Sequence, residues 1–218
     1  MGSDWTKYYE AVGLEPRTTL LEALRRFDEE GSRKRFAVDL GCGTGGDTVE
    51  LLRRGWQVLA VDGQAEAIDR LRALELAEDE RGRLETRVSQ FQTAEWPPAD
   101  LVNASFALPF CPPGDFPEVW ERIEQSLHPG GRFSGHLFGD RDEWSDEDDM
   151  TFQTRAGAAA FECASNTVLL SRPARPRCAQ FTAVKIAPAR SSTASASRRR
   201  FIAVGYAAGG TVPAPSGK

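Results

Sequence analysis

An acid two residues ahead of a glycine-rich turn is the feature of this chain best suited to binding chemistry. Residues 36–40 are apolar apart from Asp39 and predict a buried strand, and a helix is expected to begin near Asp47. The glycines between them permit positive φ and let a ligand approach the backbone without a Cβ in the way. The helix start adds unpaired N–H groups and the positive end of its dipole. The sequence therefore predicts a ligand-binding turn, with a tight turn that binds nothing as the alternative.

Two kinds of ligand fit such a turn, and the acid separates them. Gly41, Gly43 and Gly46 satisfy the dinucleotide pattern G-x-G-x-x-G, which is a weak signal alone. A carboxylate at Asp39 would face a pyrophosphate with like charge, whereas it suits a ligand that carries an ammonium group there. The turn therefore favours a ligand with an amino group over a dinucleotide.

A second acid ends the next predicted strand, at residues 56–62. Asp62 lies 21 residues beyond Gly41, close to the spacing at which a carboxylate accepts both hydroxyls of a ribose. A carboxylate has only acceptors and can take two O–H donors at once. The alternative role is a helix N-cap for the segment that starts at Ala65, and the two roles are compatible.

The spacing of apolar residues in the rest of the chain predicts alternating helices and strands, which would position Asp39 and Asp62. Helical spacing of apolar residues marks covering helices, and short apolar runs mark buried strands. Residues 4–30 are expected to be helical, with Thr6 as a cap, and residues 77–83 form a charged loop. Further helices are predicted at 49–55, 65–76 and 116–127, and further strands at 84–88, 99–106 and after Gly131. This alternation is typical of an α/β domain.

Two stretches carry a resemblance to a known family. Asp-Leu-Gly-Cys-Gly-Thr-Gly at residues 39–45 resembles motif I of class I S-adenosylmethionine-dependent methyltransferases, and Leu-His-Pro-Gly-Gly at 127–131 resembles the turn before their fifth strand. The resemblance spans residues 36–139 and implies a doubly wound, mostly parallel, Rossmann-like α/β sheet. It implies S-adenosylmethionine as cofactor and methyl transfer to a small-molecule acceptor, including a soft nucleophile such as a thiol or a chalcogen oxyanion. More narrowly, residues 41–56 resemble the small bacterial tellurite-resistance-type branch, which commonly has arginine where this chain has Gly46.

The resemblance also assigns roles in cofactor binding. Asp39 would hold the amino group of the cofactor directly or through water, and Asp62 would take the ribose. Gln90 could bond the adenine edge and Phe91 could stack on the ring, although the usual acid of that position is missing and an ordinary loop is an equal alternative. The predicted cofactor-binding residues are Asp39, Gly41, Cys42, Gly43, Gly45, Asp62, Gly63, Gln90, Phe91 and Asn103.

The acceptor is expected beside the residues that follow the fourth strand, because ligands of open α/β sheets bind off the carboxyl ends of the strands. A helix ahead of the first strand often covers the cofactor in this family. The predicted acceptor contacts are Tyr8, Tyr9, Phe106, Phe110 and His136. The alternatives are helix packing for the tyrosines, core filling for the phenylalanines and a structural role for the histidine. No residue stands out as a general base, so no catalytic residue is assigned.

Composition agrees with one ordinary domain. The chain has 218 residues, of which 40% are hydrophobic and 27% are charged. No apolar run approaches the ~20 residues that cross a bilayer, and the N-terminus lacks the layout of a secretion signal. The four cysteines have no C-x-x-C spacing, so neither a zinc site nor a disulfide framework is indicated. A cytoplasmic location and no metal are the expectations.

The C-terminal part differs from the rest in charge and composition. Residues 1–150 carry a net charge of −14, whereas residues 151–218 carry +9. We expect a methyltransferase domain at 1–155, with a lid helix at 4–30, and an atypical basic tail rich in Ala, Ser and Arg at 156–218, in part without regular structure. Residues 150–155 resemble the start of the helix that precedes the last strands of the family. Residues 168–170 and 201–206 are the strand candidates beyond it, and 191–200 reads as solvated coil.

Two interpretations of this tail stay open. It could be a basic arm that binds nucleic acid or an acidic partner, although nucleic acid has no other support. It could instead be a terminus foreign to the family, such as the product of a reading-frame change near residue 156. In that case one edge of the sheet would be unpaired and part of the core uncovered.

Two other functions compete with methyl transfer. A nicotinamide-dependent oxidoreductase is disfavoured by Asp39, by the Pro-Gly-Gly turn and by the lack of room for a substrate domain. A degenerate methyltransferase fold could bind cofactor or a partner without turnover. The unusual tail is the feature that supports this alternative. The sequence does not identify the acceptor or an oligomeric state.

Overall fold

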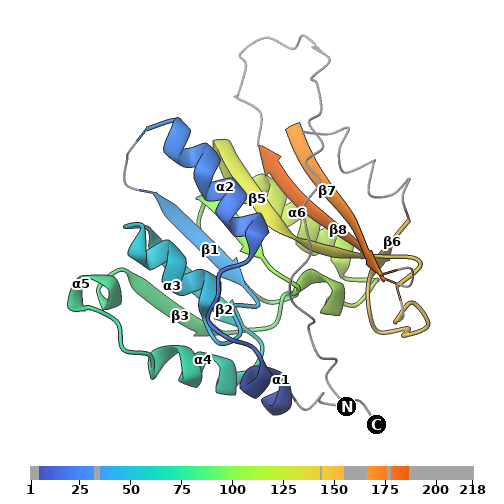
Figure 1. The fold of residues 1–218 in the computed structure, drawn as a ribbon, viewed down its shortest axis with the longest axis horizontal. Helices are drawn as coiled ribbons and strands as arrows, with labels where there is room; N and C mark the ends of the chain where they lie inside the picture. Colours follow the sequence, from blue (N-terminus) through green and yellow to red (C-terminus); the bar gives the residue numbers. More distant parts are fainter. Residues whose placement is uncertain (1–4, 32–34, 143, 155–165, 176–177, 187–218) are drawn as a thin grey trace.

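The computed structural model of the chain describes residues 5–31, 35–142, 144–154, 166–175 and 178–186 (Figure 1). All of its strands join one eight-stranded sheet. The strands are β1 (Phe36–Leu40), β2 (Gln57–Asp62), β3 (Leu84–Val88), β4 (Ala99–Ala104), β5 (Leu127–Gly139), β6 (Phe152–Gln153), β7 (Asn166–Arg175) and β8 (Cys178–Ile186). The helices are α1 (Thr6–Ala11), α2 (Thr18–Glu29), α3 (Gly46–Arg53), α4 (Ala65–Arg72), α5 (Glu78–Arg81), the 3₁₀ helix η1 (Leu108–Phe110) and α6 (Phe116–Ser126).

The sheet has the order β3-β2-β1-β4-β5-β8-β7, and its first five strands are parallel. The strand order reverses between β1 and β4, and in such sheets ligands bind beyond the carboxyl ends of the strands at this point. β8 lies antiparallel to β5, β7 lies antiparallel to β8, and the short β6 pairs with the end of β5. The predicted doubly wound, mostly parallel α/β sheet is confirmed.

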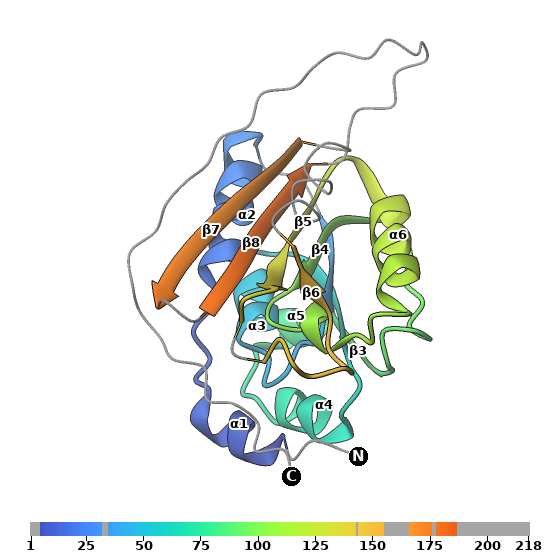
Figure 2. The same ribbon diagram turned by 90° about the vertical axis from the view of Figure 1, so that its right-hand side faces the viewer.

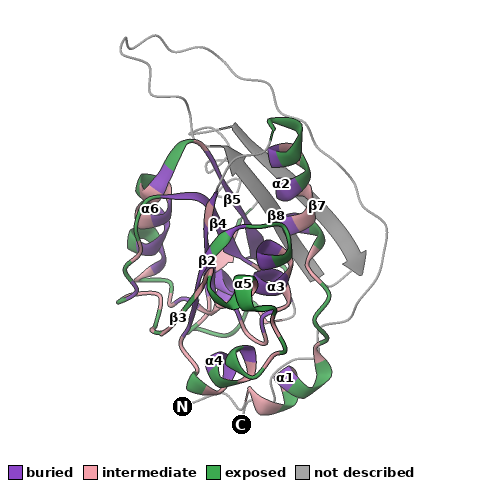
Figure 3. Ribbon diagram, turned by 90° about the vertical axis from the view of Figure 1, so that its left-hand side faces the viewer, coloured by how far each residue is buried: buried purple, intermediate pink, exposed green. Residues whose placement is uncertain are grey.

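Helices cover both faces of the sheet because side chains alternate along each strand. Val38 and Leu40 of β1 pack in the cluster that contains α6, whereas Ala37 packs in the cluster that contains α2 and α3. Figure 2 shows α6 on one side of the strands and α2 and α3 on the other. The central strands between them are almost fully buried (Figure 3).

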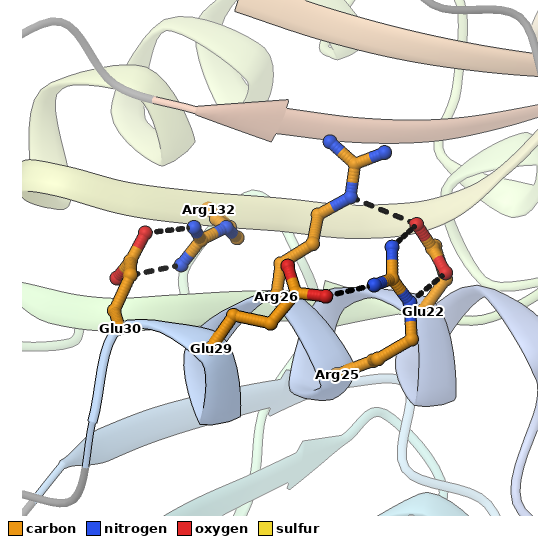
Figure 4. A network of polar contacts seen from close by, with 6 residues as sticks. All are labelled: Glu22, Arg25, Arg26, Glu29, Glu30 and Arg132. Atoms are coloured by element: carbon orange, nitrogen blue, oxygen red, sulfur yellow. Dashed lines mark hydrogen bonds and ion pairs between the residues drawn. The ribbon is translucent and has the colours of Figure 1, made fainter.

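An ion pair joins β5 to the end of α2, and Figure 4 shows it beside the charged pairs within α2. Arg132 of β5 is 3% exposed and forms an ion pair with Glu30. Its guanidinium carbon lies 3.9 Å from the ring centre of Phe27, which is itself buried in α2. This anchoring matters for the pocket, because the segment that enters α2 lines it.

The N-terminal part and three local elements differ from the sequence-based predictions. Residues 4–30 do not form one helix: Gly13 and Pro16 separate α1 from α2, since neither residue suits a helix interior. Thr6 is not the cap of α1, because Trp5 occupies that position. The predicted helix start at 150–155 is instead the strand β6, which is held by pairing with β5, and the charged loop at 77–83 contains the short helix α5. The helix expected near Asp47 begins one residue earlier.

An unpaired edge beside β5 was expected only if the terminus were foreign to the family, and the structure shows this edge paired. β8 pairs with β5 from Arg132 to Phe138, so backbone groups that would have been unpaired there find partners. The strand candidate at 168–170 is confirmed as part of β7, whereas residues 191–200 and 201–206, for which coil and a strand were predicted, lie outside the described residues. The division into a domain at 1–155 and a tail at 156–218 stays a prediction, although β7 and β8 belong to the same sheet. No helix of the described ranges is long and apolar enough to span a membrane.

Candidate active site

One pocket of about 1330 Å³ lies at the carboxyl ends of β1, β2 and β4. Its walls come from α1 and the segment after it, from the glycine turn, from the loops after β2, β3 and β4, and from the loop between β5 and β6. The lining residues are Trp5, Tyr8, Tyr9, Val12, Gly13, Glu15, Arg17, Asp39, Gly41, Cys42, Gly43, Thr44, Gly46, Asp47, Asp62, Gly63, Gln64, Gln90, Phe91, Ser105, Phe106, Ala107, Phe110, Trp144, Glu147, Asp149 and Met150.

The glycine turn forms the floor of this pocket. The backbone N–H groups of Gly41 and Cys42 both donate to the carbonyl oxygen of Val61, at 2.7 and 3.1 Å, which ties the turn to the end of β2. Gly41 has φ +69°, and a Cβ there would lie 2.4 Å from the Cβ of Ala107. Only glycine fits this position without a shift of the neighbouring backbone. Burial raises the pKa of the Cys42 thiol, so the thiol stays neutral.

Asp39 belongs to a buried hydrogen-bond network that joins β1, α3, β4 and β5. Its carboxylate accepts from the Thr48 hydroxyl at 2.6 Å and from the Asn103 amide at 2.9 Å. The same amide nitrogen donates to Asp47 at 2.9 Å, and the amide oxygen of Asn103 accepts from the Ser134 hydroxyl at 2.6 Å. Asn103 therefore acts as the shared donor that holds two carboxylates side by side.

Burial raises the pKa of the Asp39 carboxyl above its ordinary value, and the charge of Asp47 raises it further. The donors on Thr48 and Asn103 oppose this rise. Ionisation of Asp39 is thus held back by two unfavourable effects that a nearby cation would offset. A bound ammonium group would stabilise the charged form.

Asp62 joins the glycine turn to the loop after β2. Its two oxygens accept from the backbone N–H groups of Gly43, at 2.9 Å, and Gln64, at 2.8 Å. The side chain is 8% exposed, and burial raises its pKa. The alternative role as the N-cap of α4 was wrong, because Gln64 occupies that position and no side chain caps the helix.

Gln90 and Phe91 follow β3 and line the pocket, with the Gln90 amide beside Gly63. A Cβ on Gly63 would come within 2.7 Å of the Gln90 amide, so the glycine leaves room for that side chain. Phe91 is half-buried and packs against the core, and its carbonyl oxygen accepts from Arg122 at 3.1 Å. These residues form one end of the pocket.

Aromatic rings line the opposite end and come from three separate segments. Trp5 ahead of α1 contacts Phe110 of η1 edge to face, with ring centres 4.8 Å apart. Trp5 also contacts Tyr8 at 5.7 Å, and Trp144 of the loop after β5 lies 6.3 Å from Phe110. Tyr9 is 5% exposed and lies between this wall and α4.

Phe106 adopts a backbone conformation that is unusual for a residue with a side chain. Its φ is +53°, in the left-handed region, which costs on the order of 1–3 kcal/mol. Its ring stacks on His136 with centres 3.8 Å apart and an angle of 10° between the planes. Such strained conformations occur preferentially at functional sites.

His136 lies behind Phe106 and does not line the pocket. Burial, followed by the charge of Arg17, lowers the pKa of His136 to about 3, so the imidazole is neutral near neutral pH. Gly45 and Asn103 likewise support the pocket from behind its surface rather than line it. The other predicted site residues all reach the lining.

Sequence reasoning missed several lining residues. Arg17 precedes α2 and Asp47 stands in the first turn of α3, and neither position has a motif that identifies it. Glu147 and Asp149 of the loop between β5 and β6 also line the pocket. Within the described ranges no cluster of His, Cys, Asp and Glu is arranged to hold a metal ion.

Comparisons with known proteins match part of this chain to methyltransferases. Residues 37–131 match a family model described as a methyltransferase domain. A carboxy-S-adenosyl-L-methionine synthase from Psychrobacter sp. is 29% identical over 109 residues, which are 47% of this chain and 40% of that protein. The chain thus matches about two fifths of the length of its curated relatives.

Solved structures share the fold at low sequence identity. The N-terminal domain of EvdMO1, solved with bound S-adenosylhomocysteine, has a TM-score of 0.58 at 20% identity and 85% coverage of both chains. The magnesium protoporphyrin IX methyltransferase of Synechocystis PCC 6803, solved with bound S-adenosylmethionine, has a TM-score of 0.58 at 10% identity and 78% coverage of both chains. The shared fold is the Rossmann-like α/β sheet of class I S-adenosylmethionine-dependent methyltransferases.

Proposed function

We propose that the pocket binds S-adenosylmethionine and transfers its methyl group to a small-molecule acceptor. The observation that carries this proposal is the placement of Asp39 and Asp62 at the ends of neighbouring parallel strands, on either side of a glycine turn that forms the pocket floor. One carboxylate is placed for a cation and the other for a pair of hydroxyls. S-adenosylmethionine carries both groups.

The individual roles follow the order of residues along the pocket. Asp39, held by Asn103 and supported by Asp47, takes the amino group of the cofactor. The backbone from Gly41 to Gly45, with Cys42 and Gly43, lies along the aminoacyl tail. Asp62 takes the ribose, and the loops with Gly63, Gln90 and Phe91 enclose the adenine.

The aromatic end then receives the acceptor. Tyr8, Tyr9, Phe106 and Phe110 form its wall, and His136 supports Phe106. The acceptor atom attacks the methyl carbon in line with the sulfonium, the carbon–sulfur bond breaks, and its electron pair stays on sulfur. The protein contributes chiefly by proximity and orientation and by excluding water. A soft nucleophile such as a thiol or a chalcogen oxyanion can react in this way without a general base.

The sequence at residues 41–56 supports the tellurite-resistance-type branch as the finer family assignment.

Isothermal titration of the purified chain with S-adenosylhomocysteine tests the proposal, with NADH as the control ligand. We expect micromolar binding of the first ligand and no binding of the second. Binding of NADH alone would indicate an oxidoreductase, and binding of neither ligand would refute the proposal. Binding of S-adenosylhomocysteine without methyl transfer to any acceptor would favour the degenerate fold.

Replacement of Asp62 by alanine should weaken S-adenosylhomocysteine binding more than tenfold, which is about 1.4 kcal/mol or more. Asp69→Ala on the exposed side of α4 is the matched control and should leave binding unchanged. Asp62 also orders two loops, so thermal unfolding of both variants must show that the fold persists. Unchanged affinity in a folded Asp62→Ala variant would contradict the ribose assignment.

A further inference from the structure

Arg17 places a positive charge in a pocket that is otherwise acidic. Among the described lining residues it is the sole arginine, lysine or histidine, whereas six are acids: Glu15, Asp39, Asp47, Asp62, Glu147 and Asp149. The guanidinium carbon lies 5.3 Å from the ring centre of Phe106, on the acceptor side of the pocket. Its charge also acts on Tyr8. Burial raises the pKa of the Tyr8 hydroxyl, whereas Arg17 lowers it.

The backbone of Arg17 is tied to the same network that holds Asp39. Its N–H donates to Asp47 at 2.7 Å, and Asp47 accepts with its second oxygen from Asn103. Arg17 is therefore fixed at its main chain close to the predicted place of the amino group. The side chain extends from this fixed point into the pocket.

The guanidinium nevertheless has no carboxylate partner in the described part of the chain. No Asp or Glu oxygen of those residues lies within the 4.0 Å that defines an ion pair with Arg17. Three of the lining acids have other partners: Asp47 accepts from the Arg17 N–H and Asn103, Asp39 from Thr48 and Asn103, and Asp62 from two backbone N–H groups. A guanidinium presents five N–H donors in a planar fork that matches a carboxylate with two parallel bonds.

We propose that Arg17 binds a carboxylate of the ligands in this pocket. The inference rests on the proposed function and extends it, since two ligands of that reaction can supply the group. The first source is the aminoacyl tail of S-adenosylmethionine, where the carboxylate and the amino group share one carbon atom, so an amino group at Asp39 brings the carboxylate close to the segment of Arg17. The second source is an acceptor that carries a carboxylate beside the ring of Phe106.

Calorimetry with three ligands separates these sources. S-adenosylhomocysteine carries the tail, 5′-methylthioadenosine lacks it, and benzoate added to the S-adenosylhomocysteine complex probes the acceptor side. The variants are Arg17→Met, which keeps the length of the apolar stem, and Arg17→Lys, which keeps the charge without the fork. Arg25→Met is the matched control, because Arg25 lies on the exposed face of α2 and does not line the pocket.

For a cofactor carboxylate, Arg17→Met weakens S-adenosylhomocysteine binding at least about tenfold, the lower end expected for a hydrogen-bonded charge pair. Arg17→Lys recovers part of this loss, and the affinity for 5′-methylthioadenosine is unchanged. For an acceptor carboxylate, Arg17→Met leaves S-adenosylhomocysteine binding intact and abolishes the binding of benzoate. Either pattern supports the proposal, provided that Arg25→Met behaves as the wild type.

Two results overturn it. One is that Arg17→Met binds S-adenosylhomocysteine like the wild type while benzoate binds both proteins equally or neither. The other is an equal loss of affinity for S-adenosylhomocysteine and 5′-methylthioadenosine, which would show a general structural role. Failure of the wild type to bind S-adenosylhomocysteine is a different outcome, because it refutes the proposed function itself.

Discussion

Replacement of Asn103 by leucine should destabilise the protein strongly, because its amide is the shared donor of two buried carboxylates. The side chain is fully buried, and its nitrogen lies 2.9 Å from Asp39 and 2.9 Å from Asp47. Leucine has a similar size, so the main change is the loss of hydrogen bonds rather than a cavity.

The magnitude follows from the bonds that are lost. Hydrogen bonds to charged groups contribute about 1.5–3 kcal/mol each, and a neutral bond about 1 kcal/mol. Asn103→Leu removes two of the first kind, and it leaves the Ser134 hydroxyl without its acceptor. Asp39 keeps its hydrogen bond from Thr48, and Asp47 keeps its hydrogen bond from the Arg17 N–H, which limits the loss. We therefore expect the free energy of unfolding to fall by about 4–6 kcal/mol in total. This corresponds to a fall in Tm of about 10–20 °C.

The loss of stability in Asn103→Leu should grow as the pH rises. Burial raises the pKa of Asp39, so the folded state holds this proton more tightly than the unfolded state. The stability that this group contributes is fully present below the unfolded pKa of about 3.9 and is lost as the pH rises through the folded value. Without the Asn103 donor the folded pKa rises further, so stability continues to fall over a wider range of pH.

Urea unfolding at about pH 5 and about pH 8 measures both effects. Ser134→Ala is the matched control, since it removes only the neutral bond to Asn103 and should cost about 1 kcal/mol at either pH. The reasoning fails if Asn103→Leu loses less than about 1 kcal/mol at the higher pH, or if its deficit is the same at both pH values.

Three further changes test other parts of the structure. Gly41→Ala should weaken S-adenosylhomocysteine binding more than about tenfold in titration calorimetry, since its Cβ would lie 2.4 Å from that of Ala107 at φ +69°. Glu30→Gln should lower the free energy of unfolding by about 1–2 kcal/mol, because Arg132 is 3% exposed whereas Glu30 is 50% exposed and partly screened. His136 has a pKa of about 3, so its contribution to stability is present above about pH 6.5 and is lost as the pH falls. His136→Phe should remove up to about 2 kcal/mol of this decline between about pH 6.5 and pH 5.

Matched controls separate these effects from general damage. Gly55→Ala introduces a Cβ at φ +83° with no atom within 4 Å, so it should leave binding unchanged. Glu29→Gln breaks an exposed pair with Arg25 and should cost less than about 0.5 kcal/mol. Equal losses in the paired glutamate variants would contradict the burial argument. A pH dependence of unfolding that is the same in His136→Phe and the wild type would contradict the lowered pKa.

The local sequence determined most of the parallel part of the fold. Apolar runs and helical spacing predicted the strands and helices between residues 36 and 139, because these periods follow from the geometry of each element alone. The acids Asp39 and Asp62 could be placed at the ends of β1 and β2, since a strand that ends at a glycine turn fixes where its last residues lie. Asp39 and Asp62 lie close together in the pocket because β1 and β2 pair in parallel.

Only the tertiary structure decided what surrounds these acids. Asn103 lies 64 residues from Asp39 in the chain, and no local pattern shows that one amide bonds two carboxylates. The strand β6 stands where residues 150–155 favoured a helix, because its backbone groups pair with the end of β5. β8 likewise completes the sheet edge through pairing with β5, which the weak periodicity after residue 155 did not predict.

The charges in the pocket show most clearly what the tertiary structure adds to the sequence. The sequence predicted a helix over residues 4–30 and no motif marks Arg17 within them, and only the fold brings this residue to Asp47 and Phe106. The aromatic wall is similar, since Trp5, Phe110 and Trp144 come from three distant segments that the fold brings together. Local spacing determines contacts within an element, whereas contacts between distant segments depend on how those elements pack, and the aromatic end of this pocket consists of such contacts.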